Sequence, residues 1–163
     1  MTGWIFAAVT CFIYILQTTL LCKLTVLGVC PDAVLVCVLC YSMIFGREKG
    51  FMAAFTVGLL MDFVTGGFFG RHLTIYLLSS AMASFLAENT FGKNFLTAAL
   101  ITLIVSIAGG AVMSVYLYVA KLNRNIVYLM FVTTPLYALY NTTLGVFIFI
   151  LMENLRKFSF RKE

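Results

Sequence analysis

The residues best placed to do chemistry are two aspartates in apolar surroundings. Asp62 interrupts the apolar run that begins at Phe51, and Asp32 follows Pro31 at the start of another run. A carboxylate in such surroundings is costly unless a cation or hydrogen-bond donors compensate its charge. Three roles are open to Asp62: a structural ion pair or hydrogen bond, a docking site for a partner, or an ion site. For Asp32 we expect the ordinary role of an acid in the first turn of a helix.

No catalytic or metal-binding set accompanies these carboxylates in the sequence. It has no Gly-rich phosphate loop, no nucleophile elbow and no cluster of metal ligands. Cys37-x-x-Cys40 is half of a zinc or redox motif without a second ligand pair, and His72 is the only histidine. Cys22 and Cys30 flank a short segment and could bridge, although their spacing alone does not require a disulfide. We therefore expect no enzymatic activity, no cofactor and no metal site.

The spacing around Asp62 indicates how it is held. Small or acidic residues recur at every fourth position: Ala54, Gly58, Asp62, Gly66 and Gly70. On a helix this spacing forms one ridge, and small residues on a ridge let a neighbouring helix approach closely. We therefore expect the ridge to face other helices. Alternatively, Gly66-Gly67 ends the helix, and the turn that follows needs protein or water around its backbone polar groups.

The composition predicts the elements that position these residues. The chain of 163 residues is 63% hydrophobic and 10% charged, whereas soluble domains are about 45–50% apolar and about 25% charged. We predict an all-α, polytopic membrane helix bundle, with a single transmembrane domain over residues 1–152 and a short basic tail over 153–163. Although the net charge is +5, the basic tail is too short for a nucleic-acid module, and no nucleic-acid motif is present.

Run lengths predict six membrane spans, at residues 3–22, 31–45, 51–69, 73–87, 95–120 and 126–152. The connecting turns are charged or polar and lie at residues 46–50, 88–94 and 121–125. The first span lacks the basic start and cleavage site of a signal peptide, so we expect it to remain in the mature protein. Pro135 predicts a kink in the sixth span.

The distribution of basic residues predicts that both termini are cytoplasmic. With the N-terminus inside, the inner loops and the tail hold Arg47, Lys49, Lys93, Arg156, Lys157, Arg161 and Lys162. The outer loops hold Lys23, Arg71, Lys121 and Arg124. Cytoplasmic loops carry an excess of Lys and Arg, which favours this orientation. Asp32 and Asp62 then both lie toward the outer half of the bundle.

This topology places Asp62 near the C-terminal end of its helix, where the helix dipole disfavours an acid. We therefore expect a cation or several donors to compensate it, with Arg71 nearest in sequence and Lys23 in the neighbouring outer loop. On a regular helix Arg71 is about 13 Å farther along the axis. Direct pairing thus requires the chain to fold back at Gly66-Gly67. Hydroxyl or backbone N–H groups are the alternative donors.

The first part of the chain carries an ordered series of short motifs. They are Leu16-Gln17-Thr18-Thr19-Leu20-Leu21, Gly28-x-x-Pro31-Asp32, Gly46-Arg47-x-x-Gly50 and Gly58-Leu-x-x-Asp62-x-x-x-Gly66-x-x-x-Gly70. Their order and spacing over residues 16–72 resemble the rod shape-determining protein MreD family. One departure is Cys22, where many relatives carry proline. The second half of the chain resembles the family mainly in hydropathy.

The resemblance implies a multi-pass protein of the bacterial inner (cytoplasmic) membrane without enzymatic activity. Family members act with the MreC protein, the actin-like MreB, the RodA glycosyltransferase and a penicillin-binding transpeptidase, and organise side-wall peptidoglycan synthesis. Their fold resembles the substrate-binding subunits of energy-coupling-factor transporters. The resemblance and the ridge together select the candidate structural or partner-docking residues Pro31, Asp32, Gly58, Asp62, Gly66, Gly70 and Arg71.

The alternative function is a vitamin-binding subunit of such a transporter. Its coupling face would need small residues at four-residue spacing, for which Ala83-x-x-x-Ala87 is a weak signal. A small channel is disfavoured because no polar row of the kind that lines a pore is present.

Overall fold

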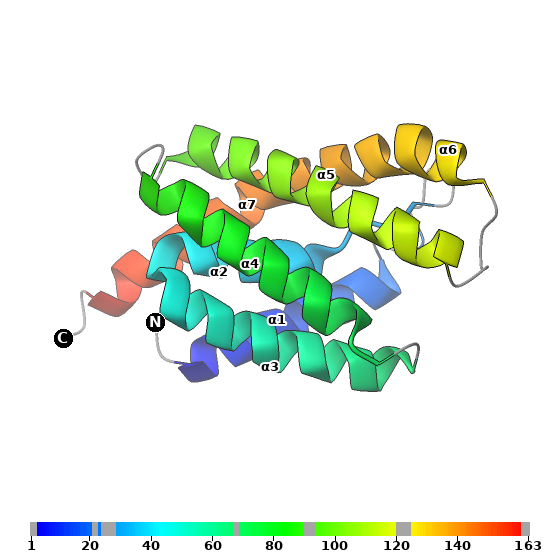
Figure 1. The fold of residues 1–163 in the computed structure, drawn as a ribbon. Helices are drawn as coiled ribbons and strands as arrows, with labels where there is room; N and C mark the ends of the chain where they lie inside the picture. The colour runs from blue at the N-terminus through cyan, green and yellow to red at the C-terminus, as the bar shows by residue number, and fades with distance from the viewer. Residues whose placement is uncertain are drawn as a thin grey trace.

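The fold is built from helices that run back and forth along one direction (Figure 1). The computed structural model describes residues 3–20, 23, 29–66, 69–89, 94–119 and 125–160. Their helices are α1 (Gly3–Thr19), α2 (Ala33–Phe45), α3 (Arg47–Thr65), α4 (Arg71–Asn89), α5 (Phe95–Val119) and a final rod of α6 (Ile126–Tyr128), η2 (Leu129–Thr133) and α7 (Thr134–Phe160). No β-strand occurs within these ranges. The predicted all-α fold is confirmed.

The two ends of the bundle differ in which helices begin there. At one end α1 begins, α7 ends and α2 joins α3 (Figure 1); we call it the terminal end. At the other end α2, α4 and α6 begin (Figure 1). We call this second end the aspartate end, because Asp32 precedes α2 there and Asp62 lies beside the start of α4.

Helix α2 is the core of the bundle. Every residue from Ala33 to Ile44 is buried, and α1, α3, α4, α5 and α7 all pack against the helix. Its sequence explains this position, since a helix that is apolar on all sides is stable only when it is surrounded. The buried hydroxyl of Ser42 in its second half is satisfied by the Val38 carbonyl and by Ser80 Oγ, each at 2.8 Å.

The junction between α3 and α4 is a tight reversal. Helix α3 ends at Thr65, and Gly66 follows in the left-handed conformation with φ 62°. Gly70 also has a positive φ, 97°, immediately before α4. The prediction of a continuous helical ridge as far as Gly70 is therefore wrong. The alternative, in which the helix ends at Gly66-Gly67, is confirmed at Gly66. Gly67 lies outside the described residues. Of the five residues of the expected ridge, Ala54, Gly58 and Asp62 lie on the buried face of α3.

The charged turn predicted over residues 46–50 is also wrong, because α3 already begins at Arg47. A single residue, Gly46 with φ 87°, reverses the chain between α2 and α3. The two helices then lie so close that a Cβ on Gly50 would stand 2.5 Å from Ser42 Oγ. The glycines at both ends of the predicted turn thus serve a close helix crossing.

The final helix differs from the predicted sixth span in two ways. A π-helical turn over Leu129–Thr133 stands directly before Pro135, whose missing N–H and bulky ring disturb regular helix. The wider turn lets both the backbone N–H and the hydroxyl of Thr134 donate to the Leu129 carbonyl. Helix α7 also continues to Phe160, with Glu153 paired to Arg156 and Lys157. Residues 153–160 of the predicted tail are therefore helical.

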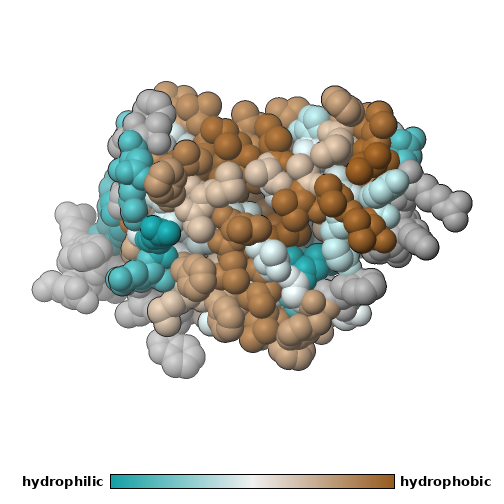
Figure 2. Space-filling model, in the orientation of Figure 1, coloured by the Kyte–Doolittle hydropathy of each residue, from teal (hydrophilic) through white to brown (hydrophobic). Residues whose placement is uncertain are grey.

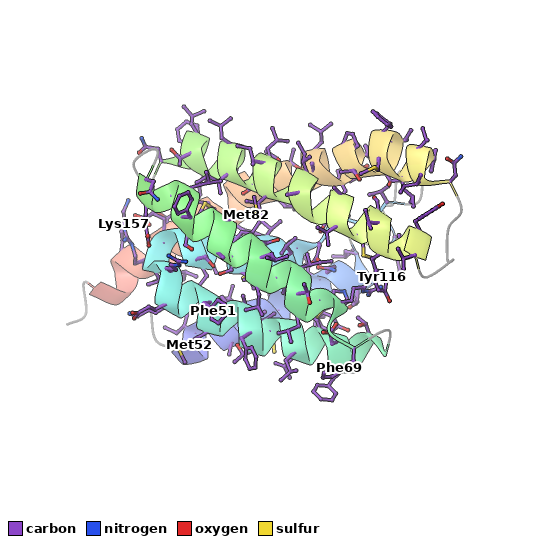
Figure 3. All side chains as sticks on the ribbon, in the orientation of Figure 1. Phe51, Met52, Phe69, Met82, Tyr116 and Lys157 are labelled. Atoms are coloured by element: carbon purple, nitrogen blue, oxygen red, sulfur yellow. The ribbon has the colours of Figure 1, made fainter. Side chains whose placement is uncertain are left out.

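Two helices are long and apolar enough to cross a membrane, at Phe95–Val119 and Ile126–Lys157. Large apolar side chains also remain exposed on the outside of the bundle, among them Phe12, Phe55, Phe85, Leu100 and Phe147. Hydrophobic residues cover the middle of one face, and hydrophilic residues gather toward its ends (Figure 2). Phe69, beside the α3–α4 turn, points away from the helices (Figure 3).

Candidate functional site

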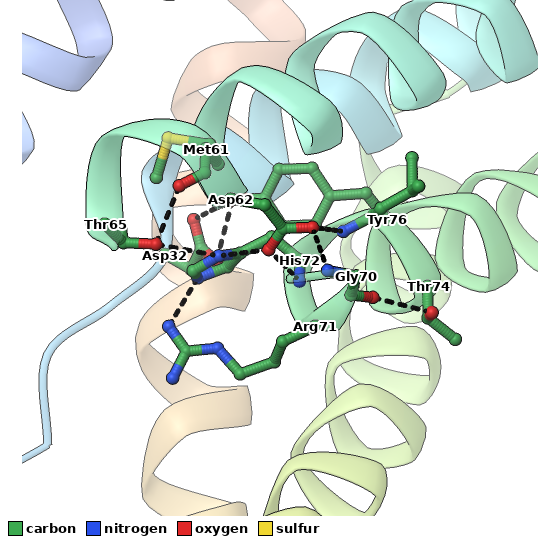
Figure 4. A network of polar contacts seen from close by, with 10 residues as sticks. Asp32, Met61, Asp62, Thr65, Gly70, Arg71, His72, Thr74 and Tyr76 are labelled. Carbon is green, nitrogen blue, oxygen red and sulfur yellow. Dashed lines mark hydrogen bonds and ion pairs between the residues drawn. The ribbon is translucent and has the colours of Figure 1, made fainter. Parts of the chain in front are cut away.

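The Asp62 carboxylate holds the start of a different helix. It accepts backbone hydrogen bonds from Gly70 at 2.9 Å, His72 at 2.8 Å and Leu73 at 3.1 Å (Figure 4). These N–H groups surround the first turn of α4, where a helix leaves its amides without internal partners. The positive end of the α4 dipole also favours a carboxylate there. Asp62, which is only 3% exposed, therefore caps α4 from α3.

Gly58 makes this cap possible. It lies one turn before Asp62 on the same face of α3, against the first turn of α4. A Cβ at this position would stand 2.8 Å from the Cα of Leu73 and 3.3 Å from the His72 carbonyl oxygen. Since backbone atoms cannot move aside as a flexible side chain does, only glycine allows α4 to approach this closely.

The expected pairing of Arg71 with Asp62 does not form, although the chain folds back as that pairing required. The side chain that contacts the Asp62 carboxylate is His72, whose Nδ1 lies 3.2 Å from Oδ1. Arg71 instead reaches the other ring nitrogen, with its NH2 group 3.1 Å from His72 Nε2. Guanidinium has only donors, so Nε2 accepts and the hydrogen is left on Nδ1, facing Asp62. A neutral imidazole thus bridges the two charged groups.

Asp32 caps α2 in the conventional way and reaches much farther besides. Its carboxylate accepts from the Leu35 N–H at 2.9 Å, which is the expected role of an N-cap acid after Pro31. Both carboxylate oxygens also lie 3.0 Å from the hydroxyl of Tyr76 on α4. The backbone N–H of Asp32 donates to Asn141 Oδ1 on α7 at 3.0 Å.

Two further polar side chains extend this network to the remaining helices. Gln17 of α1 accepts from the Val34 N–H at 3.1 Å, so α1 also helps to cap α2. Asn141 Nδ2 lies 3.3 Å from Ser106 Oγ on α5. The sequence singled out neither Gln17, Tyr76 nor Asn141 as a site residue. The available signal was their polarity within apolar runs, which in membrane helices points to interhelical hydrogen bonding.

The seven sequence-selected residues thus divide into three groups. Asp32, directly after Pro31, and Asp62 cap the two helix starts, and Tyr76 and His72 connect them, with their rings 5.9 Å apart. Gly58, Gly66 and Gly70 shape the backbone around the Asp62 cap. Arg71 touches the cluster only through His72 and places its guanidinium 6.0 Å from the ring of Tyr116 on α5.

A cavity of about 540 Å³ lies beside the Asp32 half of this cluster. It is lined from α1, α4, α5 and the final rod, as well as from the segment before α2. The polar side chains on its wall belong to Gln17, Asp32, His72, Tyr76, Ser114, Tyr128, Thr133, Thr134 and Tyr137. Gly109 and Gly110 form part of the wall, where α5 lies against α4 and close to the final rod. Asp32 is the one carboxylate among the described lining residues.

The arrangement is suited to holding helices and binding a ligand or partner. The Thr65 hydroxyl lies beside the His72–Asp62 pair, but it donates its hydrogen to the Met61 carbonyl at 2.7 Å. It is therefore not arranged as a nucleophile that His72 would activate. Within the described ranges, no three His, Cys, Asp or Glu residues come together as a metal site. Cys30 takes part in a disulfide; its candidate partner Cys22 lies outside the described residues.

Comparisons with protein-family models, curated proteins and solved structures find no match to this chain.

Proposed function

We propose that this chain is a non-enzymatic membrane component of the bacterial cell-elongation complex, a member of the MreD family. The observation that carries the proposal is that three of the four motifs of the resemblance meet in space. Gln17, Asp32 and Asp62 come from three separate motifs and hold the starts of α2 and α4 at one end of the bundle. Their spacing therefore reflects a connected structural unit.

The described glycines of the motifs support this reading, because each occupies a position that a side chain would disturb. Gly46, Gly66 and Gly70 have positive φ angles, and Gly50 and Gly58 lie against neighbouring helices at distances that exclude a Cβ. A pattern whose described glycines all have such roles is unlike a chance match of small residues.

We propose six membrane spans with both termini in the cytoplasm. The alternation of helix directions, the exposed apolar side chains and the long apolar helices α5 and α6–α7 all favour this arrangement. Arg47, Lys49, Arg156 and Lys157 lie at the terminal end, which suits a cytoplasmic face. The disulfide at Cys30 suits an oxidising compartment at the opposite end.

In this function the bundle is a scaffold for MreC, MreB, RodA and a penicillin-binding transpeptidase. Depletion from a rod-shaped host should give rounded, widened cells, since side-wall synthesis loses its organisation. Rods that persist after full depletion would reject the role. A reporter fused after Glu163 tests the topology separately, because only a reporter active in the cytoplasm should give a signal there.

The alternative, a vitamin-binding subunit of an energy-coupling-factor transporter, is favoured by one feature, the cavity at the aspartate end. A second feature opposes it. Ala83 is fully buried within the bundle, so Ala83-x-x-x-Ala87 does not offer a free face of small residues for a coupling partner. Depletion distinguishes the two functions, because loss of the transporter subunit would create a vitamin requirement and leave cell shape intact.

A further inference from the structure

The cavity at the aspartate end has the chemistry of a cation site. We propose that it binds a small organic cation, an amine or a quaternary ammonium group, with Asp32 as the counter-ion. Nothing in the scaffold role requires such a ligand, so the inference goes beyond the proposed function and can fail or succeed independently of it.

The first argument is charge. The Asp32 carboxylate is held only by donors, the Leu35 N–H and the Tyr76 hydroxyl, as an ionised carboxylate requires. Among the described residues, the ion pairs join Glu153 to Arg156 and Lys157, and the Asp62 carboxylate contacts the neutral His72; none of these contacts includes Asp32. No Lys or Arg occurs among the described residues that line the cavity. The wall therefore presents a carboxylate that no cation contacts directly, although Arg71 and His72 act on it electrostatically from farther away.

The cations closest in sequence to the cluster are already engaged. Arg71 donates to His72 Nε2 and lies over the ring of Tyr116. His72 is on the cavity wall, but its neutral form places the Nδ1 hydrogen toward Asp62, as argued above. Neither group therefore occupies the position that a cationic ligand would take beside Asp32.

The second argument is the aromatic content of the wall. Tyr76, Tyr128 and Tyr137 all line the cavity and come from α4, α6 and α7. Aromatic rings attract alkylammonium groups electrostatically, by about 0.5–1 kcal/mol at exposed positions and about 2 kcal/mol or more when desolvated. A carboxylate with several tyrosines is the combination that recognises an ammonium group and rejects an anion.

The third argument is space. The volume of about 540 Å³ falls within the range of small-molecule pockets, about 300–1,000 Å³. The remaining lining includes apolar groups such as Ile75, Met113 and Leu117, which suit the carbon skeleton of a small amine.

The test compares choline with 3,3-dimethylbutan-1-ol, its neutral isostere of the same shape, on the purified full-length protein in detergent. Titration calorimetry should detect saturable binding of choline, with much weaker binding of the isostere. Asp32→Asn should weaken choline binding about tenfold or more, since asparagine keeps the helix cap but removes the charge. Glu48→Gln is the matched control, because Glu48 is an exposed carboxylate at the start of α3; its choline affinity should equal that of the parent protein.

A second variant keeps the proposal testable if Asp32→Asn does not fold. Tyr128 is 40% exposed, so Tyr128→Leu should fold and reduce choline affinity about two- to fivefold through loss of one ring. Equal binding of choline and its isostere, undiminished choline binding in Asp32→Asn, or no saturable choline binding would each overturn the proposal. Ammonium groups also occur in lipid headgroups. Asp32-dependent stabilisation by phosphatidylethanolamine vesicles, relative to phosphatidylglycerol vesicles, would identify the lipid as the source.

Discussion

Asp32 and Asp62 each cap the N-terminus of a helix, and the two helix starts are neighbours. The hydrogen-bond partners of the two carboxylates, however, lie at very different distances along the chain. The backbone donors to Asp62 all lie between Gly70 and Leu73, within one helical hairpin. Asp32 bonds locally to Leu35 and over long range to Tyr76 and Asn141, which is 109 residues away. One carboxylate joins two helices that follow each other, and the other ties the centre of the bundle to its periphery.

Because of this difference, substitutions at Asp32 and at Asp62 should affect the stability of the bundle differently. Removing Asp62 leaves three amides at a half-buried helix start without the acceptor that they share. Asp32 belongs to a network in which Gln17 and Asn141 independently hold the backbone of the same segment. We therefore expect the Asp62 cap to be the more sensitive of the two, and the predictions below test that order.

The largest effect is expected for Asp62→Leu. This change removes the acceptor of three backbone N–H groups, and each unsatisfied buried donor costs about 1–3 kcal/mol. We expect a loss of about 3 kcal/mol or more in the free energy of unfolding, with lower abundance in the membrane. Asp62→Asn should lie between the parent and Leu, because one carbonyl oxygen remains. The measurement is thermal unfolding in detergent together with quantitative blotting of membranes; a Leu variant as stable as the parent would remove Asp62 from its central role.

The next effect is expected for Gly58→Ala, which tests the close approach of α3 and α4 without touching a hydrogen bond directly. The new Cβ would meet the Leu73 Cα at 2.8 Å, so α4 must shift away from Asp62. Overpacking of this kind costs about 1–3 kcal/mol.

Gly109→Ala is the matched control for that substitution. It is the same change within a helix, but its Cβ would meet its nearest neighbours, Ile75 Cγ2 and Ser79 Oγ, at an ordinary 3.7 Å. The unfolding midpoints of the two variants, compared in one detergent, should differ clearly. Equal midpoints would mean that α4 can retreat from α3 without disturbing the cap.

A smaller effect is expected for Tyr76→Phe on the Asp32 side. The change removes the hydroxyl that contacts both carboxylate oxygens but keeps the fully buried ring. Because Asp32 retains its bond to Leu35 and the segment retains Asn141, we expect a loss of about 1 kcal/mol, the typical value for one hydrogen bond. Chemical denaturation measures it. A loss as large as that of Asp62→Leu would reverse the order of the two sites.

The sequence predicted the helical elements well where a single chemical signal decided the outcome. The helix starting after Asp32 follows from Pro-Asp before an apolar run, and α5 follows from an uninterrupted apolar stretch. The exact turns were harder, because they depend on tertiary contact. Helix α3 begins at Arg47 and not after Gly50. Its first charged residues are exposed, while Gly50 on the same helix packs against Ser42.

The site was predictable in its local part only. The need to compensate Asp62, and backbone N–H groups as one means of doing so, follow from burial of a carboxylate. The choice of His72 over Arg71 does not, because it depends on the direction in which the chain leaves Gly70. The contacts of Gln17, Tyr76 and Asn141 join segments far apart in the chain, and one sequence cannot reveal which distant polar groups meet.

The smallest effect is expected for Arg71→Gln, the residue that the sequence suggested as the partner of Asp62. Its guanidinium contacts His72 Nε2 and the Tyr116 ring, not the carboxylate. Glutamine can still donate to Nε2 and keep the same imidazole tautomer, so the Asp62 cap should survive. Exposed or half-buried charge interactions of this kind contribute about 0–1 kcal/mol, and we expect less than about 0.5 kcal/mol here. A double-mutant cycle of Arg71→Gln with Asp62→Asn should show coupling within that limit. Coupling of several kcal/mol would mean that Arg71 and Asp62 interact directly. The Asp62 cap would then depend on more than the backbone of one hairpin, as the Asp32 network does.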